Sequence, residues 1–254
     1  MKSLSAILLL AGATWAGALD QAVDSYLAAV EEREASPWTI NGNLGATLTS
    51  GNSDAFTVSA GADATRAWDP WTLFLKAAIL YGKSEGVENA SEQIFTERLE
   101  RAISEKASLF QEFLFEHDER ERLNYRLQFT VGYRRELVEK ENFVLHGEAG
   151  GGVLHEEFRT APETEGIAQV GFDFVWKLSK NLTFTQRVVV YPSLSETGEF
   201  RVLSESIFTT PLGEQLDLRF AIIDRFDSNA PAGVKENDLL VTLSLQIRFT
   251  RKSG

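Results

Sequence analysis

The strict alternation of apolar and polar residues near the C-terminus limits what this chain can fold into. In the stretch LLVTLSLQIRF, residues 239–249, every second residue is apolar and mostly polar residues stand between them. A period of two places the apolar residues on one face of a β-strand. The stretch therefore predicts a long strand with one apolar face, which ends on the aromatic residue Phe249.

The same pattern recurs from Trp38 onward, with turn signals such as SGNSD, EGVENA, RTAPETEG and SNAPAGVKEN between the segments. The segments exceed the usual length of a globular strand, about 5–6 residues, and suit tilted strands that cross a bilayer. Around Glu97 and Glu205 neither face is clean, so the register of those two segments stays open. The twelve predicted strands span 38–50, 54–68, 71–84, 91–104, 107–118, 122–136, 142–156, 166–178, 181–194, 199–210, 214–226 and 237–250.

Alternation alone also fits a soluble β-sandwich or a lipocalin-like barrel. Three observations favour an antiparallel transmembrane β-barrel of twelve strands. The polar faces carry charges of both signs, and short turns alternate with longer loops, as in outer-membrane barrels. All four tryptophans of the barrel region, Trp38, Trp68, Trp71 and Trp176, fall at strand ends on one side and share the parity of the apolar face. Tryptophan is enriched at the membrane interface, and this end is predicted to be periplasmic.

The N-terminus has the pattern of a secretory signal. Lys2 precedes an apolar run from Leu4 to Leu10, and the small residues 16–18 follow. A membrane anchor is the alternative, but the run is shorter than the roughly 20 residues of a spanning helix. We expect a signal peptide at 1–18, a short periplasmic helix or linker at 19–37, the barrel at 38–250 and a tail at 251–254.

Composition excludes several classes of function. The chain has 37 acidic and 25 basic residues, a net charge of −12, which opposes a nucleic-acid partner because phosphate binding relies on clustered Lys and Arg. The absence of cysteine excludes disulfides and thiolate metal sites.

The parity of the strands predicts a charged lumen. Arg or Lys on the lipid-facing side would cost about 2–4 kcal/mol at the bilayer midplane, whereas inside the barrel such groups can pair or line water. Two interpretations follow: a salt-bridge network that braces a mostly closed lumen, which we favour, or a narrow polar channel. The predicted inward charges are Asp63, Lys76, Glu112, Glu116, Arg126, Arg134, Glu148, Asp173, Lys177, Arg187, Asp217, Arg219 and Arg248.

Three motifs are candidates for chemical sites. The run FEHDERER contains Glu116, His117, Asp118 and Glu119, but neighbouring side chains at a predicted outer loop diverge, so lipopolysaccharide contact through divalent ions is favoured over a specific metal site. His146 could serve a lipid-acting enzyme, yet there is no Gly-x-Ser-x-Gly elbow. Gly150–Gly152 indicates a bend or bulge. We therefore assign no catalytic, cofactor-binding or metal-ligating residue.

The stretch WTINGNLGATLTSGNSDAFTVSAGADATRAW, with Gly42, Gly45 and Thr49 before the SGNSD turn, resembles the opening hairpin of the bacterial family called domain of unknown function 481. The closing LSLQIRF is also similar, whereas the TRKSG tail departs from a family that usually ends at the final aromatic residue. Members are often labelled salt-induced outer-membrane proteins. The resemblance covers about 38–249 and implies an outer-membrane barrel with no established activity and no catalytic residues.

These observations predict a non-enzymatic outer-membrane barrel of the bacterial envelope, structural, stress-related or a narrow pore. An outer-membrane enzyme acting on lipid and a secreted soluble barrel that binds an apolar ligand are the alternatives. The expected partners are outer-membrane lipids, lipopolysaccharide and, through Phe249, the barrel-assembly machinery. Deleting Phe249 is expected to impair assembly, and trimming 250–254 is not.

Overall fold

The computed structural model describes residues 38–49, 55–84, 87–119, 122–159, 162–213, 215–230 and 235–250. The predicted signal peptide at 1–18, the predicted helix or linker at 19–37 and the tail at 251–254 lie outside the described residues.

Within the described ranges, no helix combines the length and the apolar composition that a membrane span requires.

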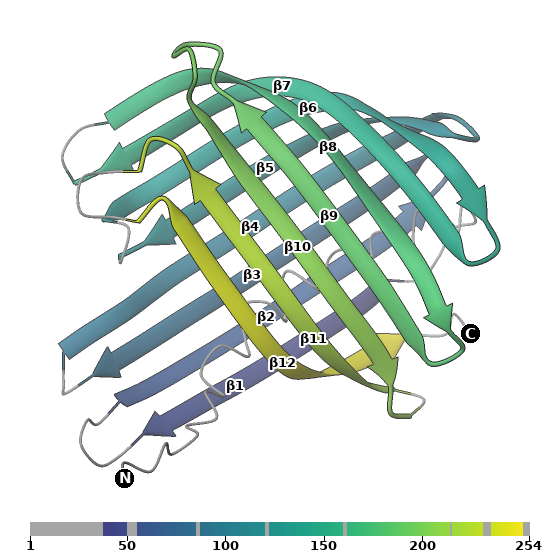
Figure 1. The fold of residues 1–254 in the computed structure, drawn as a ribbon, viewed down its shortest axis with the longest axis horizontal. Helices are drawn as coiled ribbons and strands as arrows, with labels where there is room; N and C mark the ends of the chain where they lie inside the picture. Colours follow the sequence, from purple (N-terminus) through teal and green to yellow (C-terminus); the bar gives the residue numbers. More distant parts are fainter. Residues whose placement is uncertain are drawn as a thin grey trace, which may run out of the picture.

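Twelve antiparallel strands form one closed barrel (Figure 1), as the alternation predicted. Each strand pairs with the next one along the chain, and the last pairs with the first. The strands are β1 (Thr39–Thr49), β2 (Ala55–Trp68), β3 (Trp71–Ser84), β4 (Val87–Ser104), β5 (Ala107–Asp118), β6 (Leu123–Lys140), β7 (Phe143–Phe158), β8 (Pro162–Ser179), β9 (Leu182–Pro192), β10 (Phe200–Pro211), β11 (Leu216–Asp227) and β12 (Asn237–Thr250).

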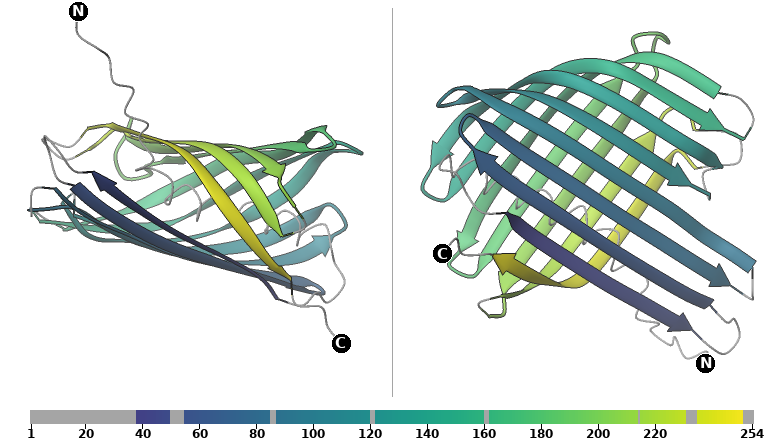
Figure 2. Two further views of the ribbon diagram at one scale, coloured as in Figure 1. Left: turned by 90° about the horizontal axis from the view of Figure 1, so that it is seen from below. Right: turned by 180° about the vertical axis from the view of Figure 1, so that it is seen from behind.

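The closing seam is shorter than the other pairings. β1 pairs with β2 along its whole length, from Thr39 to Thr49. Its pairing with β12 runs only from Thr39 opposite Thr250 to Gly42 opposite Ile247. In both views of Figure 2 the two strands meet at one end and diverge toward the other. The barrel is therefore closed at the end where the chain enters β1.

The apolar faces of the strands form the outside of the barrel, and the polar faces line the lumen. Val131 on β6 and Val170 on β8 are 52% and 56% exposed, whereas the guanidinium-bearing Arg219 on β11 is fully buried. A water-soluble barrel shows the opposite pattern, because it buries its apolar side chains. This inversion is the main physical property of the fold.

Aromatic side chains gather on the outside near the end that holds the short turns. Successive ring pairs run from β7 to β11, with centroids 4.6–6.4 Å apart; the rings are Phe143, Trp176, Phe174, Phe184, Phe208 and Phe220. Trp38, Trp68 and Trp71 lie at the same end, because they stand directly before β1, at the end of β2 and at the start of β3. The guanidinium of Arg66 lies over the rings of Trp38 and Trp68, 5.7 and 5.8 Å from their centroids. The prediction that the four tryptophans share one end of the barrel is confirmed.

Glycines allow β6 and β7 to approach each other closely. A Cβ on Gly132 would lie 2.5 Å from the Phe110 ring, and one on Gly152 would lie 1.9 Å from the Phe129 carbonyl oxygen. We predicted a bend or a bulge at Gly150–Gly152; pairing on both sides is continuous there, which contradicts the bulge and leaves the bend as a prediction. At Gly132, Gly150 and Gly152 a side chain would lie closer than 3.0 Å to neighbouring atoms, so these three positions require glycine unless the strands move apart.

Several strands extend further than the turn residues suggested. β4 begins at Val87, inside EGVENA, and β8 begins at Pro162, inside RTAPETEG. β6 continues to Lys140 through the segment predicted as a turn. Hydrogen bonding to neighbouring strands outweighs the local preference of Pro, Glu and Asn for turns at these positions.

Candidate functional site

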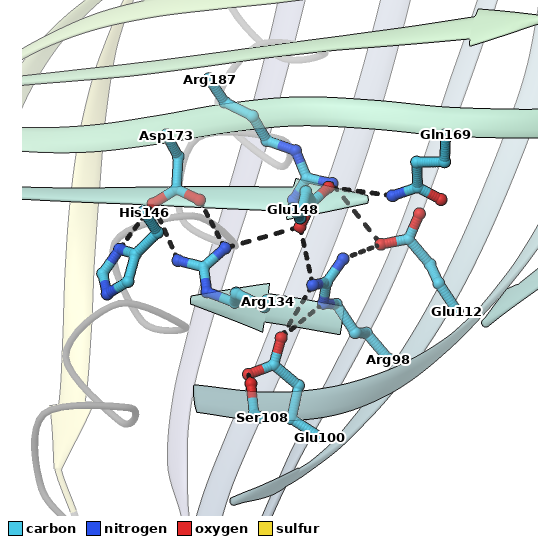
Figure 3. Close-up of polar contacts among 10 residues, drawn as sticks. All are labelled: Arg98, Glu100, Ser108, Glu112, Arg134, His146, Glu148, Gln169, Asp173 and Arg187. Carbon is cyan, nitrogen blue, oxygen red and sulfur yellow. Dashed lines mark hydrogen bonds and ion pairs between the residues drawn. The ribbon is translucent and has the colours of Figure 1, made fainter. Parts of the chain in front are cut away.

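Arg98 on β4 is the centre of a charged network in the lumen (Figure 3). Its guanidinium lies 2.8 Å from carboxylate oxygens of Glu100 on β4, Glu112 on β5 and Glu148 on β7. The face of the guanidinium rests on the Phe110 ring, 4.0 Å from its centroid. Arg98 is only 2% exposed, so three carboxylates and one ring surround a single buried cation.

Arg187 on β9 reaches the same carboxylates from another part of the wall. Its Nη2 lies 3.4 Å from Glu148 and 3.6 Å from Glu112. The amide of Gln169 on β8 also donates to Glu148, at 2.9 Å. Glu148 and Glu112 are thus shared between arginines of β4 and β9, which are five strands apart along the wall. The side chains of strands that are not neighbours in the wall therefore meet inside the lumen.

Arg134 and His146 extend the network toward the end with the short turns. Arg134 on β6 donates two hydrogen bonds to Asp173 on β8, one of them from Nη2 at 2.8 Å. His146 Nδ1 lies 3.1 Å from the same carboxylate, and Arg134 Nη1 lies 3.6 Å from Glu148. Figure 3 shows these side chains converging from β6, β7 and β8.

A second layer of ion pairs lies nearer the other end of the barrel. Arg126 on β6 contacts Glu116 and Glu156. Arg225 on β11 lies 3.1 Å from Glu92 on β4 and 3.7 Å from Glu116 on β5. Strands β11 and β5 stand on opposite sides of the ring of twelve. A contact between their side chains means that the lumen is narrow enough for one arginine–glutamate pair to span it.

Cavities are found at the two ends. The larger, about 760 Å³, opens at the end with the short turns and is lined by Trp71, Lys106, Glu136 and Phe143 near its mouth and by Arg134 and His146 at its inner end. The smaller, at the other end beside Tyr191 and Arg201, is about 20 Å³. Lys106, in the turn after β4, donates hydrogen bonds to Glu136 and Glu139 on β6, and these carboxylates raise its pKa above the usual value. The two ion-pair layers lie between these cavities.

The energetics favour a complete network. A buried charge without a partner costs several kcal/mol, so charges inside a protein are paired and hydrogen-bonded. Arg98, Glu100, Glu112 and Glu148 are each less than 10% exposed, and each has an ionic partner. Removing one member would leave its partners with fewer counter-charges in a buried site, so the pairs depend on one another.

Most predicted inward charges lie in the lumen. Arg187 lines it with a side chain that is 14% exposed, and Lys177 is exposed at the mouth of the larger cavity. The side chain of Arg248 lies outside the described part of the structure. The confirmed buried residues are Asp63, Lys76, Glu112, Glu116, Arg126, Arg134, Glu148, Asp173, Asp217 and Arg219.

The sequence analysis did not identify Arg98 and Glu100, which belong to the charged network centred on Arg98. They lie on β4, where Glu97 interrupts the apolar face, so that alternation alone does not determine which face is turned inward. The pairing of β4 with β5 settles the register and turns Arg98 and Glu100 inward. The available signal was a majority: Glu88, Glu92, Arg98 and Glu100 share one parity of β4, against Glu97 and Arg101 on the other.

The first half of the run FEHDERER, residues 115–118, is the end of β5, as the predicted strand 107–118 implied, and its side chains alternate between the lumen and the outside. Glu116 and Asp118 are buried in the lumen. His117 Nδ1 lies 2.7 Å from the backbone oxygen of Asn124, and Glu119 pairs with Arg159. Within the described residues no group of three or more His, Asp or Glu side chains is arranged to hold a metal ion.

His146 and Asp173 have the geometry of a base and its orienting carboxylate, and His146 lines the larger cavity. A hydrolase of this kind also needs a nucleophile in hydrogen-bond contact with the base. In the part of the chain that the structure describes, the partner of the His146 ring is Asp173, and no hydroxyl is bonded to it. Asp173 also holds Arg134, so the pair forms part of the ion-pair network.

Comparisons with known proteins found a curated relative and several similar solved structures. The chain is 26% identical over 252 residues to "Uncharacterized protein YdiY" of Escherichia coli (strain K12), which covers 96% of this chain and 97% of that protein. Among solved structures it is similar to the translocator domain of the autotransporter NalP from Neisseria meningitidis, with 12% identity, a TM-score of 0.48 and coverage of 92% and 97%. The NanC porin has 8% identity, a TM-score of 0.45 and coverage of 85% and 99%.

The resemblance seen in the opening hairpin and the closing strand extends along the barrel. The family described as "Protein of unknown function, DUF481" matches residues 42–249, from β1 to the end of β12. This chain belongs to that family.

Proposed function

We propose that this protein is a non-enzymatic barrel of the bacterial outer membrane whose lumen is braced and closed by ion pairs. The membrane position is supported by the inverted exposure of the strands. Large apolar side chains such as Ile79, Phe129 and Val153 are 46–54% exposed on the outside. In water such a surface would favour aggregation, whereas in a bilayer it contacts lipid. The aromatic row at one end matches an interfacial girdle.

The observation that carries the function is the crossing of the lumen by Arg98, Arg187 and Arg225. A porin of sixteen or more strands leaves an aqueous channel, and an eight-stranded barrel is filled by its side chains. Here Glu148 contacts arginines of both β4 and β9, and Arg225 on β11 contacts Glu116 on β5. These side chains fill the middle of a twelve-stranded barrel. A solute or hydrated ion would have to separate these pairs to pass, so we propose bracing with at most restricted permeation.

Single-channel recording in planar bilayers tests the closed lumen. The refolded protein is expected to show no conductance steps or only rare small ones, while a sixteen-stranded porin in the same bilayer gives stable open channels. Stable porin-like conductance of this protein would overturn the proposal. Heat-modifiable migration in detergent is the control for folding, and full solubility without detergent would argue for a secreted soluble barrel.

The His146–Asp173 pair at the larger cavity gives one specific reason to keep a lipid-acting enzyme as a second candidate. Esterase or phospholipase activity that is lost in His146→Ala and retained in His155→Ala would support it. Equal activity in the wild type and His146→Ala would remove His146 from any catalytic role.

Export and assembly complete the proposal. We propose that residues 1–18 are removed on export, which N-terminal sequencing of the mature protein would test. The partners that fit this position are lipopolysaccharide, outer-membrane lipids and the barrel-assembly machinery, the last through Phe249. A nucleic-acid partner does not fit a chain with a net charge of −12.

A further inference from the structure

Three arginines lie on the outside of the barrel near the end that holds the short turns. Arg66 on β2, Arg101 on β4 and Arg135 on β6 are exposed. They share the parity of the apolar face, on alternate strands of one side of the wall. Their ladder partners on β3, β5 and β7 carry no charge; these partners are Leu73, Trp71, Leu109, Ala107 and Gly147. A chain with a net charge of −12 thus presents three cations here with no carboxylate beside them in the ladder.

These outward arginines differ from the arginines of the lumen in their partners. Arg98, Arg126 and Arg134 each contact at least two carboxylates. Within the described residues, the side chains of the three outward arginines form no ion pair and no hydrogen bond. Each guanidinium carries five N–H donors. Those donors are therefore directed to the medium that surrounds the barrel.

Two of the three guanidinium groups lie over a pair of tryptophans. Trp68 lies directly opposite Trp71 in the ladder of β2 and β3, and Trp71 lies directly opposite Arg101. The guanidinium of Arg66 is 5.8 Å from the centroid of Trp68, and that of Arg101 is 5.7 Å from the centroid of Trp71. Only β3 separates their strands, so the two backbones lie about 10 Å apart across the wall. The two cations thus flank one aromatic platform, and a ring contact does not consume their N–H donors.

The tryptophans also mark the depth of this surface in a membrane. Tryptophan is enriched at the interface between hydrocarbon and water, which is the level of the lipid headgroups. Arginine stacks on aromatic rings and binds phosphate through two parallel hydrogen bonds from its planar fork. At this depth the lipid phosphate is the anion that the membrane itself provides. Its chemistry fits cations that have no carboxylate partner among the described residues.

We propose that the surface formed by Arg66, Trp68, Trp71, Arg101 and Arg135, the arginine surface, binds the phosphate of an anionic phospholipid in the leaflet that meets the short turns. The proposal rests on the proposed membrane position and adds the class of lipid and the residues that bind it. A zwitterionic headgroup also carries a phosphate, but its ammonium group would be repelled by three arginines. The arginine surface therefore selects a headgroup with a net negative charge.

Lipid titration of the folded protein tests this selectivity. The protein in a neutral detergent is titrated with phosphatidylglycerol or with phosphatidylcholine, and the bound lipid is counted by native mass spectrometry. We expect at least one phosphatidylglycerol to bind at least about tenfold more tightly than phosphatidylcholine. Equal affinity for the two lipids would overturn the proposal. Displacement of phosphatidylglycerol by an equal concentration of inorganic phosphate would overturn the assignment to a lipid.

Matched variants test whether the arginine surface is the place of binding. Arg66→Gln with Arg101→Gln is expected to weaken phosphatidylglycerol binding at least about tenfold, because two charge-assisted contacts are lost. Arg122→Gln with Arg159→Gln removes the same charge from exposed residues at the opposite end and should leave the affinity unchanged. Equal losses in the two double variants would show a response to net charge alone and overturn the site.

A conservative variant guards against a folding defect. Arg66→Lys with Arg101→Lys keeps both charges and should still prefer phosphatidylglycerol to phosphatidylcholine, with heat-modifiable migration as the measure of folding. Loss of the preference in this folded variant would contradict recognition by charge. A folded, membrane-inserted wild type without any lipid preference overturns the arginine surface and leaves the membrane barrel intact. A protein that is soluble without detergent overturns both proposals.

Discussion

Arg98 on β4 and Glu148 on β7 form an ion pair of 2.8 Å between side chains that are each 2% exposed, although 50 residues separate them in the chain. Glu148 is also contacted by Arg187 and Arg134, and Arg98 by Glu100 and Glu112. The pair therefore joins the carboxylates around Arg98 to the arginines around Glu148. Its contribution to stability and its effect on permeation can be measured separately.

Removing the central cation should destabilise the barrel. In Arg98→Ala three buried carboxylates lose a partner, and we expect the free energy of unfolding to fall by about 3–5 kcal/mol. Urea unfolding in lipid vesicles, followed by tryptophan fluorescence, measures this. The control is Lys106→Ala, which breaks an exposed ion pair with Glu136 and should cost less than about 1 kcal/mol. Equal losses in the two variants would contradict the role given to Arg98.

Opening the lumen should require the loss of cross-lumen pairs and not merely of charge. The variant Glu112→Ser with Arg187→Ser removes one charge of each sign, leaves the net charge unchanged and breaks a 3.6 Å contact between β5 and β9. We expect conductance steps that are larger and more frequent than those of the wild type. Glu119→Ser with Arg159→Ser removes an exposed pair and should have no effect. If the Glu112→Ser, Arg187→Ser variant shows no more conductance than the wild type, other side chains close the lumen.

The close approach of β6 and β7 should make Gly132 intolerant of a side chain. In Gly132→Ala the new methyl group would meet the Phe110 ring at 2.5 Å and the Ala149 carbonyl oxygen at 2.6 Å. Overpacking of this kind costs about 1–3 kcal/mol, and displacement of Phe110 would also disturb the guanidinium of Arg98 that rests on it. Gly42→Ala has open space around its Cβ and serves as the control in the same unfolding assay. Equal stability of the two variants would refute the packing argument.

The last strand should need its exact length. Phe249 pairs with Ile40 in the short seam that closes the barrel. Deleting Phe249 leaves residues up to 248 in register but places Thr250 opposite Ile40, so a polar residue takes the place of the aromatic residue in the four-pair seam. We expect a lower fraction of heat-modifiable, membrane-inserted protein after cell fractionation. Removal of residues 251–254 should leave the membrane-inserted fraction unchanged. Thr250 is retained in this truncation because it pairs with Thr39. Wild-type membrane levels of the Phe249 deletion would refute this prediction.

Much of the fold followed from local patterns. Alternation predicted the number of strands, and parity placed Arg134, Glu148 and Asp173 in the lumen, because side-chain direction in a strand depends only on position. The predicted strands corresponding to β4 and β8 begin too late, at 91 and 166 instead of Val87 and Pro162. Hydrogen bonds to the neighbouring strands extend a strand through residues that favour turns in isolation. The register of β4 was open for a related reason: Glu97 breaks its apolar face, and parity alone cannot choose between two imperfect faces.

The sequence by itself determined which residues face outward and which face inward, and therefore the class of barrel and the charged character of its lumen. Only the tertiary structure decided which charges meet. Arg98 and Glu148, or Arg225 and Glu116, become partners because closure of the sheet brings distant strands across a narrow space. That distance depends on the curvature of the whole sheet, including the close approach at Gly132 and Gly152, and no local pattern encodes it.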